Sequence, residues 1–177
     1  RDQGRLTVRE RIDKLVDEKT FHEVGAISGV ADLHIRSLLD KQQFADPEGV
    51  AEALGISSAT WPLFGLLWPS GLQLAQHMAS RPLVINERVL EIGCGLALAS
   101  LVMHRQGIDV TASDHHPMAG PFLQANLDLN SLPPMPYNQG DWSQLSPSSI
   151  DGRFDLIMGS DVLYERDDGG RSEERRV

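Results

Sequence analysis

The sequence contains one cysteine, Cys94, among 177 residues, so it can form no internal disulfide and no zinc site built from several thiolates. It has no uninterrupted run of about eighteen apolar residues and no apolar leader behind a basic start, so neither a membrane span nor a secretory signal is predicted. Basic residues are few: 16 Lys and Arg against 25 Asp and Glu give a formal net charge of -9, which repels a phosphate backbone. We therefore expect a cytoplasmic protein that binds neither nucleic acid nor a membrane.

Short apolar runs alternate with longer helical patterns between residues 88 and 160. The strands are predicted at residues 88–93, 108–113, 135–137 and 153–160, and the helices between them at residues 96–107 and 117–129. Strands that are joined by helices need crossover connections, which place the strands in parallel. The sequence therefore predicts an α/β fold with a Rossmann-like, doubly wound parallel sheet.

Helical patterns also precede this sheet. They are predicted at residues 33–43, in a segment that starts near Asp46 and Pro47 and ends at Gly55, in a short turn through Trp61 and Phe64, and in residues 66–80 with Pro69 at the helix start. An acid followed by a proline is typical of a helix start, and a glycine is typical of a helix end. The helix at residues 66–80 has its apolar residues near helical spacing, so we expect it to cover the sheet.

An acid and two glycines mark the end of the first predicted strand, in the order Glu91, Gly93, Gly95. Glycine lets the chain turn sharply and approach a ligand, and free amides at the next helix start favour a negative group. Asp114 ends the second strand roughly twenty residues later, where an acid accepts hydrogen bonds from ribose hydroxyls. A dinucleotide fingerprint needs glycine or alanine where Leu98 stands. The pattern predicts an adenosine-type ligand and keeps an NAD(P)-dependent oxidoreductase as an alternative.

Five motifs in order, FGLLWPSG, VLEIGCGLALASL, TASDHHP, GDW and FDLIMGSDVLYE, make residues 33–165 resemble a known enzyme family. They are similar to the class I S-adenosylmethionine-dependent methyltransferases, and more narrowly to the family-16-type protein lysine methyltransferases. The resemblance implies S-adenosyl-L-methionine as cofactor, no metal, and a protein lysine as acceptor, with a small molecule as the alternative acceptor. It also implies that the sheet here is incomplete, with about four of seven strands.

The resemblance assigns roles to individual residues. The residues implied to bind the cofactor are Trp68, Gly71, Glu91, Gly93, Gly95, Asp114, Asp141, Trp142 and Ser160. Among these, Asp114 is expected at the ribose, and Asp141 and Trp142 at the adenine. Asp161 and Tyr164 match the catalytic element at the mouth of the methyl-transfer site, where an acid attracts a lysine ammonium and a dry pocket favours loss of its proton.

Each assignment has a structural alternative. The two glycines could form only a tight turn, Asp114 could cap a helix, Trp68 and Trp142 could be packing residues, and Asp161 and Tyr164 could be a solvated strand end.

Two other residue types invite a chemical role. Cys94 has no histidine in a nucleophile motif, so apolar packing is expected for it. His115 and His116 are neighbours and cannot both face one metal in regular structure, so a place on the surface or at a pocket rim is expected for them.

The two ends of the chain differ from the middle. Residues 1–32 resemble the N-terminal opening of carboxyltransferase subunits of acyl-CoA carboxylases and predict an unrelated extension, with a capped helix near residues 7–16 and a strand near residues 21–27. Residues 166–177 are charged and predict a disordered tail. Only 13 residues follow Tyr164, so we expect a methyltransferase core that is truncated at its C-terminus. A noncatalytic fragment or a chimeric gene product is the alternative to an enzyme, and the oligomeric state is open.

Overall fold

The computed structural model describes residues 33–43, 45–140 and 152–162, together with the backbone of residues 21–24. The predicted helix at residues 7–16 and the predicted tail at 166–177 lie outside the described residues, as do Asp141, Trp142 and Tyr164. None of the described helices is long and apolar enough to cross a membrane.

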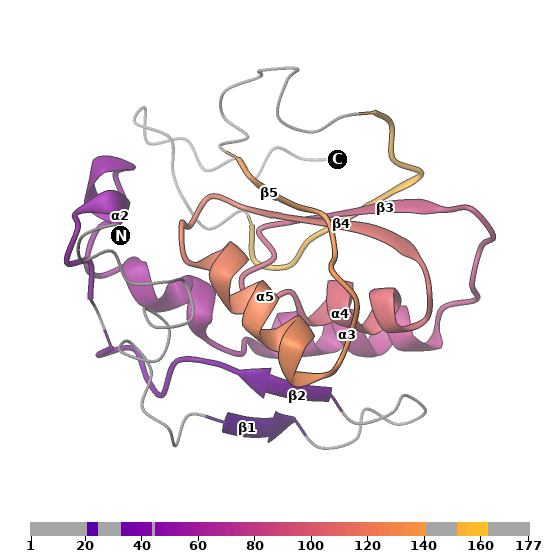
Figure 1. Ribbon diagram of the computed structural model, residues 1–177, viewed down its shortest axis with the longest axis horizontal. Helices are drawn as coiled ribbons and strands as arrows, with labels where there is room; N and C mark the ends of the chain where they lie inside the picture. The colour runs from indigo at the N-terminus through magenta and orange to yellow at the C-terminus, as the bar shows by residue number, and fades with distance from the viewer. Residues whose placement is uncertain (1–20, 25–32, 44, 141–151, 163–177) are drawn as a thin grey trace, which may run out of the picture.

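Four parallel strands form the central sheet (Figure 1). They are β3 (Arg88–Ile92), β4 (Asp109–Asp114), β5 (Tyr137–Gln139) and β6 (Leu156–Met158), in the spatial order β5-β4-β3-β6. In this register all four carboxyl ends lie at the same edge of the sheet. The predicted α/β class and the parallel strands are confirmed. The candidate ligand-binding residues meet at this carboxyl edge, which we call the ligand edge.

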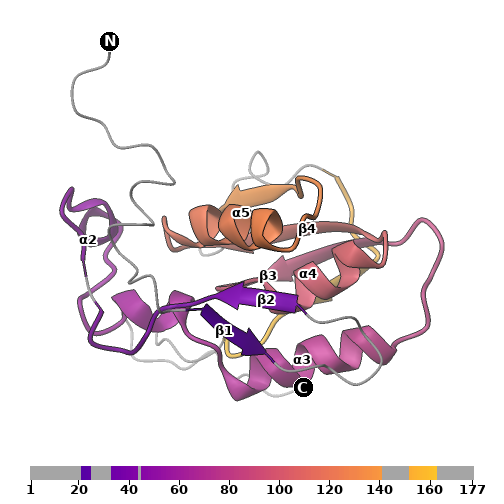
Figure 2. The ribbon, with the colours of Figure 1, turned by 60° about the horizontal axis from the view of Figure 1, so that its bottom comes forward.

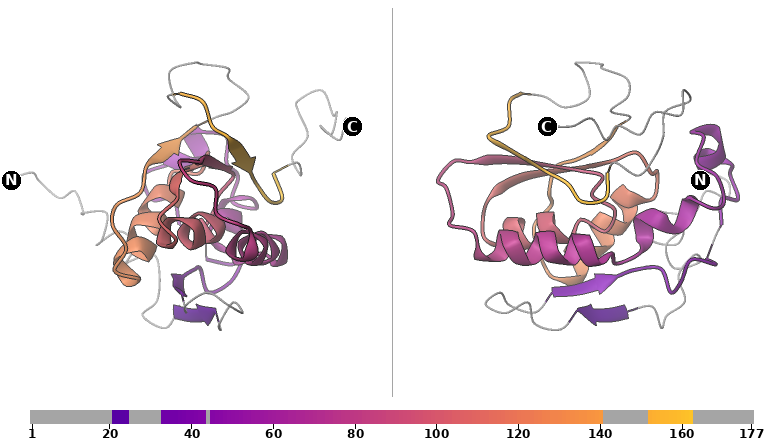
Figure 3. Two further views of the ribbon diagram at one scale, coloured as in Figure 1. Left: turned by 90° about the vertical axis from the view of Figure 1, so that its right-hand side faces the viewer. Right: turned by 180° about the vertical axis from the view of Figure 1, so that it is seen from behind.

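Three helices cover one face of this sheet (Figure 3, left). They are α3 (Pro69–Ser80), α4 (Leu98–Arg105) and α5 (Ala119–Leu129). All three are predicted from the sequence, although α4 and α5 each begin two residues later than expected, at Leu98 and Ala119. Val89 and Val110 are fully or almost fully buried on the sheet face that these helices cover, so burial of apolar surface holds the two layers together.

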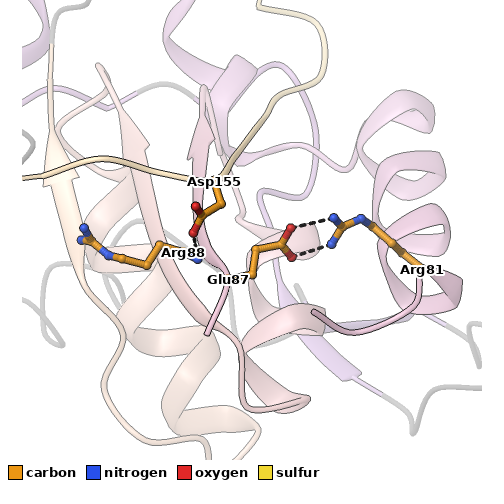
Figure 4. A network of polar contacts seen from close by, with 4 residues as sticks. All are labelled: Arg81, Glu87, Arg88 and Asp155. Atoms are coloured by element: carbon orange, nitrogen blue, oxygen red, sulfur yellow. Dashed lines mark hydrogen bonds and ion pairs between the residues drawn. The ribbon is translucent and has the colours of Figure 1, made fainter. Parts of the chain in front are cut away.

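Two polar contacts anchor the opposite end of β3, where the strand begins (Figure 4). The Arg81 guanidinium donates two hydrogen bonds of 2.6 Å to the Glu87 carboxylate. The backbone N–H of Arg88 donates to the Asp155 carboxylate at 2.9 Å, just before β6. These contacts fix α3 and β6 to the start of β3, away from the ligand edge.

The predicted helix at residues 33–43 is wrong. Residues Leu33–Arg36 form strand β2, which pairs antiparallel with β1 (Phe21–Val24). The two strands lie below the helices in Figure 1 and come forward in Figure 2. Leu33 and Ile35 are buried while His34 is exposed, which is the two-residue period of a strand. The pair spans the predicted domain boundary at residue 32, which stays a prediction.

Side chains of α5 complete the hydrogen bonding of β2. Asn126 accepts from the Arg36 N–H at 2.7 Å and donates to the Arg36 carbonyl at 3.3 Å. One helical turn later Asn130 accepts from the His34 N–H at 2.8 Å and donates to the His34 carbonyl at 2.7 Å. The two amides therefore take the place of a neighbouring strand, and this arrangement stabilises β2 where helix formation was expected.

The segment between β2 and α3 contains two short helices. Helix α2 (Val50–Ala53) begins later than predicted, but Asp46 still caps it, because its carboxylate accepts the N–H groups of Val50 and Glu52. The predicted turn through Trp61 is a 3-10 helix, η1 (Trp61–Gly65), and the Trp61 side chain is buried. This segment brings η1 against the ligand edge of the sheet.

Replacing Asn126 with alanine removes both bonds to the Arg36 backbone from a fully buried position. We expect a loss of about 1–3 kcal/mol in the free energy of unfolding, measured by urea denaturation. Asn130→Ala should cost less, because Asn130 is only half-buried and water can reach its partners. Gln124→Ala, at an exposed position of the same helix, is the control, and a loss for it equal to that of Asn126→Ala would contradict the role of the asparagines.

Candidate functional site

Every second residue of the turn between β3 and α4 has a left-handed backbone conformation. Gly93 has φ 59°, Gly95 has φ 51° and Ala97 has φ 57°. At Gly95 the constraint is also steric, because a Cβ atom there would lie 2.8 Å from the Phe64 carbonyl oxygen. Glycine is therefore required at 95 both by the backbone angle and by the close approach of η1.

The Asp114 carboxylate faces this turn. One of its oxygens accepts the Gly95 N–H at 2.8 Å and the other accepts the His116 N–H at 2.8 Å. Asp114 is 9% exposed. Burial raises its pKa, whereas the bonds from the backbone of His116 and Gly95 oppose that rise. The sequence expectation that this acid lies beside the glycine turn agrees with the geometry, and its contact with ribose stays a prediction.

Amides of the turn are largely occupied by protein acceptors. Besides the Gly95 N–H, the Cys94 N–H donates to the Ser113 carbonyl at 3.0 Å and the Ala97 N–H donates to the Cys94 carbonyl at 2.6 Å. The expectation of free amides is wrong for these three groups, because the end of β4 and the turn itself satisfy them. A phosphate would have to compete for these donors, whereas a ligand that needs no N–H group of the turn would not.

Glu91 satisfies the start of α4. Its buried carboxylate accepts hydrogen bonds from both the N–H and the hydroxyl of Ser100, in the first turn of that helix. An acid at a helix N-terminus is favoured by the helix dipole. Burial nevertheless raises the pKa of Glu91 to about 7, and the bonds from Ser100 oppose the rise. The observed contacts of Glu91 hold the turn to α4, and a contact with a cofactor stays a prediction.

The start of α3 carries Trp68 and Gly71, and it lies against the residues that follow β6. The Trp68 indole donates to the Leu63 carbonyl at 2.9 Å, so it packs against η1 whether or not it also borders a ligand. A Cβ atom on Gly71 would lie 3.6 Å from the Ser160 hydroxyl. Trp68 also lines an open groove of about 460 Å³ formed by residues 37–41 and 66–69.

Asp161 lies after β6 at the same edge of the sheet. It has φ 53° and accepts a hydrogen bond from the hydroxyl of Ser70 in α3. The structure thus brings eight of the predicted site residues to one edge, namely Trp68, Gly71, Glu91, Gly93, Gly95, Asp114, Ser160 and Asp161. Their predicted partners Asp141, Trp142 and Tyr164 lie outside the described residues.

His116 is not at the surface or at a pocket rim, so that expectation is wrong. It is 5% exposed and stacks on Phe64, with ring centres 4.0 Å apart, and Trp61 meets both rings edge-on. Burial lowers its pKa to about 4, so the ring is neutral near pH 7. This cluster of Trp61, Phe64 and His116 fixes η1 beside the turn. Within the described ranges no group of three or more potential ligands could hold a metal.

Cys94 is buried, and burial raises the pKa of its thiol well above the ordinary value. The thiolate form is therefore disfavoured. This agrees with the expectation that Cys94 is a packing residue rather than a nucleophile.

Sequence reasoning missed three residues that shape the site: Phe64, Ser70 and Ser100. Phe64 acts through its carbonyl oxygen, which no sequence pattern reveals. Ser70 stands between Pro69 and Gly71 at a helix start, and this position is a signal for a hydroxyl with a role outside the helix interior. Ser100 lies nine residues after Glu91, and only the strand-turn-helix geometry shows that they meet.

Gly95→Ala combines an unfavourable backbone angle with a clash against the Phe64 carbonyl oxygen. We expect the free energy of unfolding to fall by about 2 kcal/mol or more, measured by urea denaturation. Gly107→Ala is the matched control, because its φ is also positive, at 83°, but no atom lies within 4 Å of the added Cβ. Equal losses for the two variants would show that η1 does not constrain the turn.

The stability of the protein should depend on the proton of Glu91. Its pKa is higher in the folded state than in the unfolded chain, so the folded state binds the proton more tightly and loses stability as the pH rises from about 4.5 to about 7. Relative to Glu91→Gln, the wild-type free energy of unfolding should fall by up to about 3 kcal/mol over that range, measured by denaturation at several pH values.

Glu87→Gln provides a control of opposite sign. The bond from Arg81 lowers the pKa of Glu87, so its contribution to stability is present above pH of about 4.5 and is lost as the pH falls through its folded pKa. A flat difference between wild type and Glu91→Gln would contradict the assignment of Glu91 as a buried acid.

Comparison with known proteins places this sequence in a family. The family described as Lysine methyltransferase matches residues 62–169, more than half of the chain. The chain is 31% identical to a zebrafish (Danio rerio) electron transfer flavoprotein beta subunit lysine methyltransferase over 106 residues, which are 59% of this chain and 40% of that relative.

Two other relatives show similar coverage. The Xenopus laevis histone-arginine methyltransferase METTL23 is 31% identical over 58% of this chain and 45% of its own. The mouse (Mus musculus) protein N-lysine methyltransferase METTL21A is 30% identical over 58% of this chain and 49% of its own. The chain therefore spans less than half of the length of these curated relatives. Because this family matches more than half of its residues, the chain belongs to the lysine methyltransferase family.

Proposed function

We propose that the protein binds S-adenosyl-L-methionine and transfers its methyl group to the side-chain amine of a protein lysine. The observation that carries the proposal is the Asp114 carboxylate, which is held against the Gly95 turn at the carboxyl edge of a parallel sheet. Ligands of such sheets bind at this edge. Membership of the lysine methyltransferase family supports the same reaction.

The described residues fit the cofactor. A carboxylate offers about four acceptor positions, so the bonds from Gly95 and His116 leave Asp114 able to accept ribose hydroxyls. In this proposal Gly93 and Gly95 would lie beside the methionine part, and Trp68 and Gly71 would border the cofactor. The remaining predicted contacts are those of Glu91, Ser160, Asp141 and Trp142.

Occupied amides favour this cofactor over a dinucleotide. A pyrophosphate needs free N–H groups at the glycine turn, whereas those of Cys94, Gly95 and Ala97 already have acceptors. Leu98 also stands where a dinucleotide fingerprint needs a small residue. The sugar and sulfonium of S-adenosylmethionine make no such demand.

The bound cofactor would supply an electrophilic methyl group, and its C–S bond breaks as the new N–C bond forms. The chain's own residues attract and orient the lysine, whose ammonium gives up its proton to solvent before the neutral amine attacks, and S-adenosylhomocysteine leaves with the sulfur electron pair. Asp161 is exposed and lies at the mouth of the site, where a carboxylate attracts a lysine ammonium. Tyr164 is the proposed partner of Asp161 in this role. The net charge of -9 suits a basic acceptor segment.

Relatives differ in the acceptor that their names state. Two of the relatives reported above are named lysine methyltransferases, and one is named a histone-arginine methyltransferase. A lysine is proposed here because the family that matches the chain is described by that activity. A protein acceptor is proposed over a small molecule for the same reason.

The proposal predicts that the chain binds S-adenosylhomocysteine, the product form of the cofactor, in isothermal titration calorimetry. Asp114→Asn keeps the size of the side chain but removes its charge, so it should weaken binding about tenfold or more through the loss of charge-assisted hydrogen bonds to the ribose. With labelled S-adenosylmethionine and purified electron transfer flavoprotein beta subunit, wild-type protein should label lysine and Asp114→Asn should label it more slowly.

Asp109→Asn is the control, because it removes a carboxylate from the exposed start of the same strand, at the opposite edge of the sheet. It should bind S-adenosylhomocysteine like the wild type. Absence of binding by folded wild-type protein would overturn the proposed function, and label on arginine alone would overturn the choice of acceptor.

A further inference from the structure

Ser70 connects α3 with the turn that carries Asp161. It is the second residue of α3, and its hydroxyl donates a hydrogen bond to the Oδ2 atom of Asp161 across 91 positions of sequence. In the part of the chain that the structure describes, no donor contacts the other oxygen of Asp161. One oxygen of the acid is thus fixed by the protein, and the other retains its capacity to accept.

Two close approaches hold the same turn in place. Ser160 lies against Gly71, where an added Cβ would be 3.6 Å from the serine hydroxyl. Gly159 lies against the end of β3, where an added Cβ would be 3.0 Å from the Ile92 carbonyl oxygen. The turn is therefore enclosed between α3 and β3, and the Ser70 bond determines how the carboxylate at its exposed end is oriented.

The beginning of α3 also lies beside this acid. The residue before the helix, Trp68, makes no side-chain capping bond, and Pro69 has no N–H. The positive end of the helix dipole therefore lies beside Asp161 without another acid in the first turn of α3.

We propose that Ser70 is a positioning residue that holds the Asp161 carboxylate toward the acceptor amine. The inference rests on the proposed function, because it concerns the same methyl-transfer site. Ser70 does not touch the amine in this account. It restricts the rotation of Asp161, so that the free oxygen is held in place before the amine arrives.

Sinefungin provides a test that needs no acceptor protein. It is a cofactor analogue that carries a primary amine at the position of the transferred methyl group, whereas S-adenosylhomocysteine carries nothing there. The ratio of the two dissociation constants therefore reports on an acid at the methyl-transfer position. In the full chain, Asp161→Asn should weaken sinefungin about tenfold and leave S-adenosylhomocysteine unchanged.

Ser70→Ala should weaken sinefungin about fivefold without changing the affinity for S-adenosylhomocysteine. Ser70→Thr keeps the hydroxyl and should restore most of the loss. In an Asp161→Asn background, Ser70→Ala should have little further effect, because the two residues act as one unit. Ser80→Ala, at the other end of the same helix, is the control and should change neither affinity.

Other outcomes overturn the inference. Equal weakening of both ligands by Ser70→Ala would show a structural role for the start of α3, and an unchanged sinefungin affinity would show that Ser70 does not position Asp161. Both results leave the proposed function intact, because wild-type protein still binds S-adenosylhomocysteine. If folded wild-type protein binds neither ligand, the proposed function fails and the role of Ser70 fails with it.

Discussion

The hydrogen bond from the Gly95 N–H to the Asp114 carboxylate is the contact on which the ligand edge depends. It joins the turn after β3 to the end of β4, and it requires that a carboxylate be buried close to a backbone amide. Because the Phe64 carbonyl oxygen leaves no space for a Cβ at 95, η1 closes the turn from outside. The turn after β3, the end of β4 and η1 are distant in sequence, and together they determine how the turn and the Asp114 carboxylate are placed.

Three acids end on this edge, and their surroundings give them different chemistry. Glu91 is buried under the turn and satisfies the start of α4, so its charge serves the fold. Asp114 is nearly buried but oriented toward the turn, which suits recognition of hydroxyl groups. Asp161 is exposed and held by Ser70, which suits a cationic partner. Increasing exposure across the edge thus separates a structural acid, a proposed ligand-binding acid and a proposed catalytic acid.

The sheet and its helices could be predicted because their apolar periods are long and their glycines stand at the turns. The sequence pattern of β2 wrongly predicts a helix, because a four-residue strand carries little periodicity and its stabilising partners Asn126 and Asn130 lie about ninety residues away. At the site, the glycines and Asp114 follow a recognisable spacing. Phe64, Ser70 and Ser100 could not be found from spacing, because a carbonyl oxygen and two hydroxyls act there through contacts between distant elements.

The asparagine pair on α5 has a geometric consequence for β2. Residues one turn apart on a helix are separated by about 6 Å along its axis, and alternate residues of a strand by about 6.6 Å. The two repeats nearly match over one interval, so Asn126 and Asn130 can each pair with the N–H and C=O groups of one outward-facing residue of β2. The next position in that helical row is Phe122, which is buried and apolar. The match between helix and strand therefore ends after the two asparagine pairings. Because these pairings occupy the outer edge of β2, that edge cannot pair with a strand of another molecule.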